Sequence, residues 1–174
     1  SEMCIRDRAT ISDVSFDEDT VGSLLLSASD VDGDVLTFSI TGGSEITATL
    51  DGSDIAFTAS ENFNGSETFT ITTTDSELSD SQDITVTVNA VNDPPVATTG
   101  LSGTTNEDQD IVINLSGTDV DGDALTFTAG TPSNGSVVVD GNIATYSPNE
   151  NYNGDDSFTF TVSDGELDDT ATVT

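Results

Sequence analysis

The sequence contains no histidine, no lysine and no tryptophan, and its only cysteine and only methionine are Cys4 and Met3. Without His and Lys, and with a single Cys, the chain has no common nucleophile–base pair and no disulfide framework. Paired carboxylates could in principle cleave glycosides. However, the acidic motif described below occurs twice, which would be unusual for an active site. We therefore expect that the protein is not an enzyme.

Positive charge is almost absent as well. The chain has 33 Asp and Glu against 2 Lys and Arg, and both basic residues, Arg6 and Arg8, lie near the start. A net charge of −31 repels nucleic acid and anionic membrane surfaces. There is no run of about 18 apolar residues and no signal-peptide pattern. Residues 1–8 differ in composition from the rest, so we treat them as a flank that is not part of the fold.

Alternation of apolar and polar residues is the main pattern that remains. Phe158, Phe160 and Val162 alternate with polar residues, as expected for a strand with one buried face. The pair Asp140-Gly141 predicts a tight hairpin turn. Turn signals recur every 8 to 12 residues or so, which is typical of an antiparallel sandwich. We predict an all-β fold of two tandem seven-stranded Greek-key β-sandwiches of the immunoglobulin-like kind.

The tandem organisation follows from an internal repeat of 89 residues. The sequence Asp-Val-Asp-Gly-Asp occurs at 30–34 and again at 119–123, and other matches keep this offset from residue 18 to about residue 167. Near the end, residues 84–87 match residues 171–174 at an offset of 87, which predicts a small deletion. Pro94 and Pro95 make the boundary a short, stiff linker. We predict repeats at 9–91 and 92–174, the second truncated in its last strand.

The repeated pentapeptide is the strongest candidate for a binding site. In an extended backbone, residues i, i+2 and i+4 project to the same side, so three carboxylates crowd together. Ca²⁺ takes clusters of oxygen ligands of this kind. An EF-hand loop is excluded, because Val35 and Ala124 stand where its glycine is required. A solvated Asp-Gly turn remains the alternative interpretation.

These motifs resemble those of cadherin repeats, and most closely the bacterial cadherin-like tandem repeats. The resemblance is carried by Phe16–Thr20 with Leu26–Asp34, by the linker Asn92–Pro95, and by the late segment Thr161–Gly165. It covers essentially all of residues 9–174. Two departures are Ala90, where cadherins have Asp, and Pro94, where Asn is usual. They imply fewer or weaker calcium ions than in cadherins.

The resemblance implies calcium at the junction of the two repeats. Glu18 would come from repeat 1 and Asn92 with Asp93 from the linker. The top of repeat 2 would supply the remaining junction ligands, Asp119, Asp121 and Asp164. Two further half-sites would belong to other junctions: one at the top of repeat 1, with Asp30, Asp32 and Asp75, and one at the base of repeat 2, with Glu107. Together with the repeated pentapeptides, the expected metal residues are Glu18, Asp30, Asp32, Asp34, Asp75, Asn92, Asp93, Glu107, Asp119, Asp121, Asp123 and Asp164.

The function implied is a calcium-binding structural module of a large exported bacterial surface protein, serving cell adhesion. Calcium would make the junction rigid. The expected location is extracellular, and the expected partners are neighbouring repeats, other cell-surface proteins or glycans. Nucleic acid and direct membrane contact are not expected. A glycan- or protein-recognition module and a metal-independent acidic spacer remain the alternatives.

Overall fold

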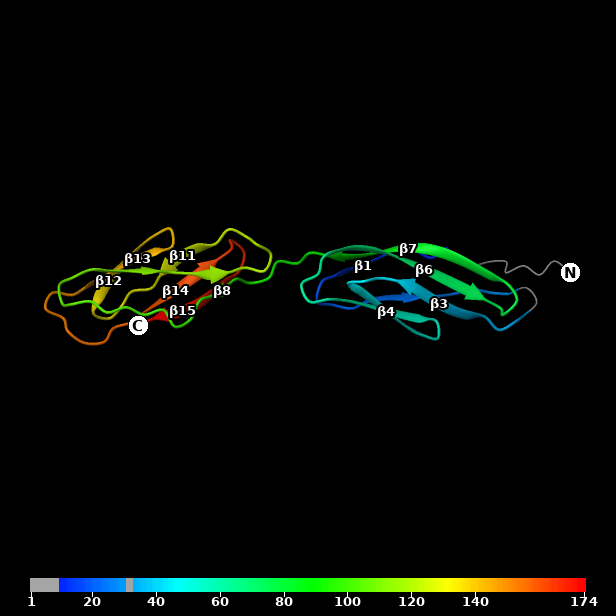
Figure 1. Cartoon of the computed structure of the whole chain (residues 1–174), viewed down its shortest axis with the longest axis horizontal. Coiled ribbons are helices and arrows are strands. Elements are labelled where there is room, and N and C mark those ends of the chain that lie inside the picture. Colours follow the sequence, from blue (N-terminus) through cyan, green and yellow to red (C-terminus); the bar gives the residue numbers. More distant parts are fainter. Residues whose placement is uncertain (1–9, 31–32) are drawn as a thin grey trace. The chain divides into compact units, whose positions relative to one another are not determined.

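The alternating segments form strands in the computed structural model, which describes residues 10–30 and 33–174 (Figure 1). This described part contains no helix, so the predicted all-β class is confirmed. It therefore also contains no helix long and apolar enough to cross a membrane. The described residues divide into two units that meet between Val91 and Asn92. The predicted flank, residues 1–8, and Ala9 lie outside the described residues.

Unit 1 is a sandwich of two sheets. The larger sheet has the order β1-β7-β6-β3 and the smaller one the order β2-β5-β4. Strand β1 runs parallel to β7, and the other pairs are antiparallel. The seven strands match the predicted number; their bounds are β1 Val14–Asp17, β2 Gly22–Leu25, β3 Thr37–Gly42, β4 Ile46–Asp51, β5 Asp54–Ala59, β6 Gly65–Thr74 and β7 Ser79–Asn89.

The core of unit 1 is the apolar face of these strands. Phe57 and Phe69 are fully buried and meet edge to face, with ring centroids 5.4 Å apart. Aromatic pairs of this geometry stabilise a core beyond the area that they bury. Apolar residues that alternate with polar ones along these strands and their ends form much of this core: Leu26, Ile55, Phe57, Phe69, Ile71, Ile84, Val86 and Val88. Leu24 and Phe38 are partly buried against them.

Unit 2 has the same plan with different strand lengths. Its sheets are β11-β14-β15, β12-β13-β9 and the small pair β10-β8. It has eight strands, because it contains the two-residue strands β8 and β10 whereas residues 103–106, at the positions of β1, form no strand. The bounds are β8 Val96–Ala97, β9 Ile111–Asn114, β10 Gly117–Thr118, β11 Thr126–Ala129, β12 Gly135–Asp140, β13 Ile143–Pro148, β14 Phe158–Ser163 and β15 Asp168–Val173.

The predicted hairpin of unit 2 forms, but its turn lies one residue later. Asp140 pairs with Ile143, so Asp140 is the last residue of β12 and the two-residue loop is Gly141-Asn142. Gly141 has φ +60°, a conformation that glycine adopts without steric cost. The backbone carbonyl of Asn142 then accepts a hydrogen bond of 2.8 Å from the N–H of Leu115. This hydrogen bond fixes the hairpin loop to Leu115, the residue that follows β9.

The strand register corrects the alignment of the two repeats. Phe69 pairs with Ile84 in unit 1, and Phe158 pairs with Val173 in unit 2. Both positions differ by 89, so the offset persists to the end of the chain and the predicted two-residue deletion is wrong. Thr174 corresponds to Thr85 rather than to Thr87. The alternating Thr and aliphatic residues at 171–174 can be aligned with unit 1 at an offset of 87 or of 89. Only the pairing of β14 with β15 distinguishes the two offsets.

Candidate metal centre

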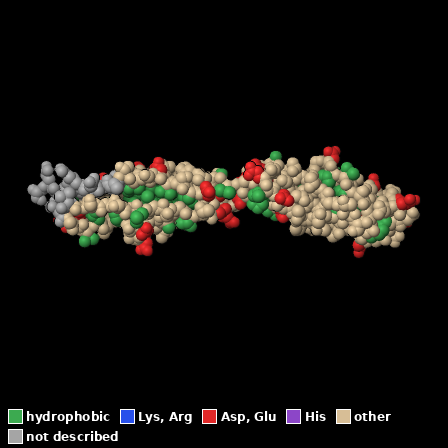
Figure 2. All heavy atoms as spheres, turned by 180° about the vertical axis from the view of Figure 1, so that it is seen from behind, with side chains coloured by type: hydrophobic (Ala, Val, Ile, Leu, Met, Phe, Trp, Pro, Cys, Tyr) green, Lys and Arg blue, Asp and Glu red, His purple; other side chains and the backbone are tan. Residues whose placement is uncertain are grey.

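The acidic loop of unit 2 follows β10 and brings three carboxylates together. One carboxylate oxygen from each of Asp119, Asp121 and Asp123 lies within 4.8 Å of the others. The loop is held by a 3.2 Å hydrogen bond from the Asp123 N–H to Asp119 Oδ1 and by Gly122 at φ +80°. Figure 2 shows acidic side chains gathered at the end of unit 2 from which the linker leaves. The crowding predicted from the pentapeptide is confirmed.

Two linker residues fold onto the acidic loops of the same unit. The Asp93 N–H donates a 2.8 Å hydrogen bond to Asp121 Oδ2. The Asn92 side-chain amide donates a 2.9 Å hydrogen bond to Oδ2 of Asp164, which follows β14. The other oxygen of Asp164 accepts the N–H groups of Glu166 and Leu167, both at 2.7 Å. The Asn92 amide, aided by these N–H groups, lowers the pKa of Asp164.

The donor set fits a hard divalent cation. Oδ2 of Asp119 is shielded from solvent and has no hydrogen-bond partner, although Oδ1 of the same carboxylate is bonded. A shielded carboxylate oxygen without a partner is costly. No side chain of unit 2 can neutralise it, because the sequence has no Lys, Arg or His after Arg8. Carboxylate, amide and carbonyl oxygens are the ligands that Ca²⁺ prefers. The residues present therefore fit calcium.

The copy in unit 1 reproduces part of this arrangement. The Asp34 N–H donates to Asp30 Oδ1 at 3.2 Å, as in unit 2. Asp75 Oδ1 accepts the N–H groups of Glu77 and Leu78, and these bonds lower its pKa, that to Leu78 most. Asp32 lies outside the described residues. The 89-residue offset puts Met3 and Cys4, also outside them, at the positions of Asn92 and Asp93. Neither Met3 nor Cys4 carries a side-chain oxygen.

The two predicted glutamates have different environments. Glu18 is only 4% exposed; its Oε1 accepts the Val91 N–H at 2.6 Å, and its Oε2 is buried without a hydrogen-bond partner. Glu107, its counterpart in unit 2, is exposed. The residue after each glutamate has positive φ, 57° at Asp19 and 62° at Asp108. Glu18 therefore fixes the last residue of unit 1, which no sequence pattern indicated.

The sequence interpretation also missed a pair of acidic residues that hold loops. The carboxylate of Glu67 accepts the N–H groups of Ser44, Glu45 and Ile46 and the Ser44 hydroxyl. These bonds, chiefly that from the Ser44 hydroxyl, lower the pKa of Glu67 to about 2. Asp156, 89 residues further on, accepts the N–H groups of Ser133 and Asn134. The sequence signal that could have revealed this pair is the 89-residue offset between Glu67 and Asp156.

The Tyr146 hydroxyl also belongs to this second anchor. It donates a 2.9 Å hydrogen bond to Asp156 Oδ2. Burial, together with this negative neighbour, raises the pKa of Tyr146 to about 12. Both anchors therefore serve loop structure.

Comparisons with known proteins agree on the fold. A family model described as bacterial Ig domain matches residues 6–87 and 92–174. No curated protein matches the chain. A crystal structure of human protocadherin-24 EC1-2 is similar, with TM-score 0.54 and 15% identity over 87% of this chain and 86% of that chain. At this identity the likeness concerns the fold alone, so membership of the cadherin superfamily stays a prediction.

Two further solved structures are more distant in shape. An endo-fucoidan hydrolase of glycoside hydrolase family 107 has TM-score 0.37 and 23% identity over 93% of this chain. This chain spans only 27% of the length of that hydrolase. Titin domains Z1Z2, solved in complex with telethonin, have TM-score 0.41 and 13% identity over 94% of this chain and 90% of that one. Neither match carries an argument about this chain.

Proposed function

The chain belongs to the bacterial Ig domain family, and we propose that its two domains form a calcium-binding structural segment of an exported bacterial surface protein. Tandem immunoglobulin-like domains suit a structural surface module. Under this proposal the protein works outside the cell, its nearest partners are neighbouring repeats, and its role is in adhesion to other cell-surface proteins or glycans.

One observation carries the calcium proposal. The carboxylates of Asp119, Asp121 and Asp123 meet within 4.8 Å, and Oδ2 of Asp119 is shielded without a hydrogen-bond partner. Like charges at this separation repel each other, and a cation among them would turn this repulsion into attraction. Asp164 is anchored to the same end of unit 2 through Asn92. The proposed ion is held by the aspartates of this loop, with Asn92, Asp93 and Asp164 as the other candidate ligands.

The same residues suggest how calcium would act on the linker. Val91 is bonded to Glu18 in unit 1, whereas Asn92 and Asp93 are bonded to acidic loops of unit 2. A cation that fixes Asp121 would also fix the start of unit 2, because the Asp93 N–H binds that carboxylate. Calcium would then restrict the backbone between Val91 and Asp93. The participation of Glu18 as a ligand stays a prediction.

Calorimetric titration with Ca²⁺, repeated with Mg²⁺, tests the proposal. We expect binding with a dissociation constant of about 10⁻⁴ to 10⁻³ M, the range of extracellular modules. Calcium should also raise the melting temperature of the chain, because it binds the folded state. Asp121→Asn should weaken the binding and reduce this rise.

The matched control is Asp140→Asn, which removes the same charge from the exposed end of β12. It should leave the calcium response unchanged. If both variants respond like the original chain, the acidic loop is not the site. If the original chain shows no calcium binding at millimolar concentration, the metal-independent spacer is the better account.

A further inference from the structure

The segment from residue 124 to residue 149 is almost free of charge. In a chain with 33 Asp and Glu, Asp140 is the only acidic residue of this segment, and the segment has no basic residue. The equivalent segment of unit 1, residues 35–60, contains Glu45, Asp51 and Asp54. The acid-poor segment includes strands β11, β12 and β13. The charge that would repel another copy of this chain is therefore sparse along these three strands.

Strand β12 lies at the edge of its sheet. It pairs with β13, which in turn pairs with β9. The Asn149 N–H donates to the Asn134 carbonyl at 2.8 Å. Because bonded pairs alternate along an antiparallel ladder, the N–H and C=O groups of residues 135, 137 and 139 point away from β13. Within residues 10–30 and 33–174, these groups have no backbone partner.

The free edge of β12 carries none of the usual features that prevent pairing. Edge strands are commonly protected by a charged side chain, a proline or a bulge. Gly135–Val139 contains no charged residue and no proline, and its register with β13 runs without a bulge. The single charge of the strand, Asp140, lies at the hairpin end. The edge is thus open to another strand.

An exposed apolar row continues from this edge across the outer face of the sheet. Val138 on β12, Thr145 on β13 and Val112 on β9 lie opposite one another in the ladders. Val138 is 69% exposed and Val112 is 59% exposed. The equivalent positions of unit 1 hold Thr49 and Ser23, both exposed. The fold itself therefore does not require apolar side chains at these positions.

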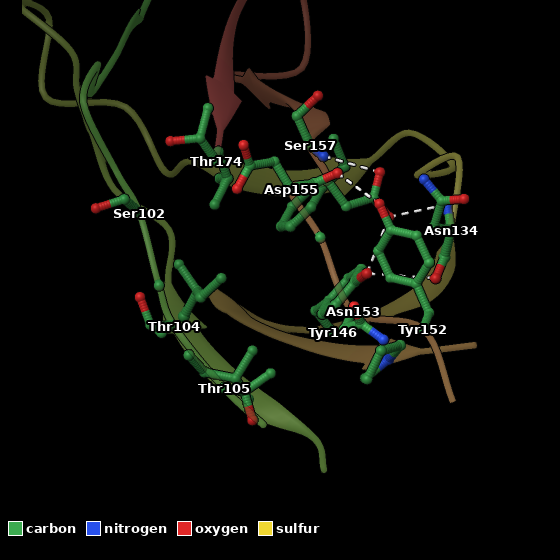
Figure 3. Close-up of a pocket in the computed structure, with 18 of the residues that line it drawn as sticks. Ser102, Thr104, Thr105, Asn134, Tyr146, Tyr152, Asn153, Asp155, Ser157 and Thr174 are labelled. Atoms are coloured by element: carbon green, nitrogen blue, oxygen red, sulfur yellow. Dashed lines mark hydrogen bonds between the residues drawn. The ribbon is translucent and has the colours of Figure 1, made fainter. Parts of the chain in front are cut away.

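Both ends of β12 are fixed by hydrogen bonds within unit 2. The Asn134 N–H donates to Asp156 Oδ2 at 2.9 Å, and the Tyr146 hydroxyl donates to the Asn134 carbonyl at 3.4 Å. Figure 3 shows Asn134 and Tyr146 among the residues around a pocket of unit 2. At the other end, the Asn142 carbonyl accepts the Leu115 N–H. Little conformational freedom would be lost when an edge held in this way pairs with a partner.

We propose that the free edge of β12 pairs with β12 of a second copy of this chain. In antiparallel pairing about a two-fold axis, Val137 lies opposite Val137 of the second copy, and Gly135 lies opposite Val139. The outward N–H and C=O groups of the two strands then bond to each other, because an antiparallel strand is complementary to itself. Val138 of each copy comes next to the other strand. A second copy fits this edge because acidic side chains are sparse there. The proposal does not depend on calcium binding.

Sedimentation equilibrium in chelator, with enough sodium chloride to screen the net charge, tests the proposal. We expect a dimer at chain concentrations up to about 1 mM. Val138→Glu puts a like charge at the pairing edge of both copies and should raise the dissociation constant of the dimer at least about tenfold. Val138→Thr copies Thr49 of unit 1, removes only apolar surface and should raise it by less. The matched control is Val21→Glu, which makes the same change at a valine of unit 1 that is 63% exposed.

Hydrogen exchange identifies the edge that pairs. The amides of Val137 and Val139 point away from β13, so they should exchange quickly at low chain concentration and slowly in the dimer. The amides of Ser136 and Val138 belong to the bonded pairs with β13 and serve as the internal reference. Their exchange should change little on dimerisation.

Three results would each overturn the proposal. The first is a chain that stays monomeric up to about 1 mM, which would leave the edge to a strand of another protein. The second is a dimer in which exchange at Val137 and Val139 is the same as in the monomer, which would assign the contact to another surface. The third is a dimer that Val138→Glu and Val21→Glu weaken equally.

Discussion

At the scale of single residues, the two units fill an equivalent part of the core with a large side chain that comes from a different position in each unit. In unit 1 the large residue is Phe16, and Gly22 lies against it; a Cβ at Gly22 would lie 2.4 Å from the Phe16 ring. In unit 2 the large residue is Ile111, which occupies the position of Gly22, and Gly103 lies close to it. Cores tolerate such exchanges when the total volume is kept.

Gly22→Ile should therefore destabilise unit 1 by about 1–3 kcal/mol, because the added side chain overlaps Phe16. Urea unfolding measures the change. The double variant Phe16→Thr with Gly22→Ile copies the pair Thr105 and Ile111 of unit 2, and it should recover part of the loss. An unchanged midpoint for the single variant would show that the Phe16 ring moves aside without cost.

At the scale of elements, Glu67 connects strand β6 to the turn between β3 and β4. Its charged form is stabilised by N–H and hydroxyl donors, which lower its pKa from 4.5 to about 2. A lowered pKa in the folded state means that the contribution to stability is complete above the unfolded value of about 4.5. This contribution is then lost as the pH falls toward 2.

Glu67→Gln should consequently cost unit 1 about 1–2 kcal/mol near pH 7, because an amide cannot accept all of these hydrogen bonds. The difference from the original chain should shrink as the pH falls from 5 to about 2. Urea midpoints at several pH values measure it. Glu61→Gln, at an exposed glutamate nearby, is the control and should change little. A cost that does not vary with pH would contradict the hydrogen-bonded role.

The strands and the acidic loop could be predicted from the sequence, but their registers and anchors could not. Alternation predicted β14 because Phe158, Phe160 and Val162 face one side in any register. Residues 171–174 matched the first repeat at the wrong offset, because their Thr and aliphatic pattern has no distinctive side chain. The ladder between β14 and β15 resolves this, since Val162 pairs with Asp169.

The candidate site also combines contacts between residues that are close in sequence with contacts between distant segments. The crowding of Asp119, Asp121 and Asp123 is local and follows from their spacing. The bonds from Asn92 to Asp164 and from Asp93 to Asp121 join segments that are far apart in sequence. Family resemblance predicted that these residues act together, and the fold shows the contacts. The hydrogen bond from the Val91 N–H to the buried carboxylate of Glu18 depends on backbone geometry that no spacing reveals.

At the scale of the whole molecule, charge is the dominant physical constraint. The chain carries a net charge of −31, and no basic side chain follows Arg8. Self-repulsion of this size opposes compact states, and monovalent salt screens it without selecting any position. Calcium bound at Asp119–Asp123 would instead neutralise one end of unit 2, next to the linker. Salt and calcium should therefore have different effects on the linker.

Small-angle scattering in calcium, in chelator, and in sodium chloride of matched ionic strength can separate these effects. We expect a narrower range of inter-domain distances in calcium than in either other condition, because the ion fixes Asp121 and, through it, Asp93. Glu18→Gln should reduce this difference if Glu18 contributes to the site. Glu107→Gln makes the same change at the equivalent, exposed position of unit 2 and should leave the difference intact. Identical profiles in calcium and in chelator would contradict calcium-dependent stiffening.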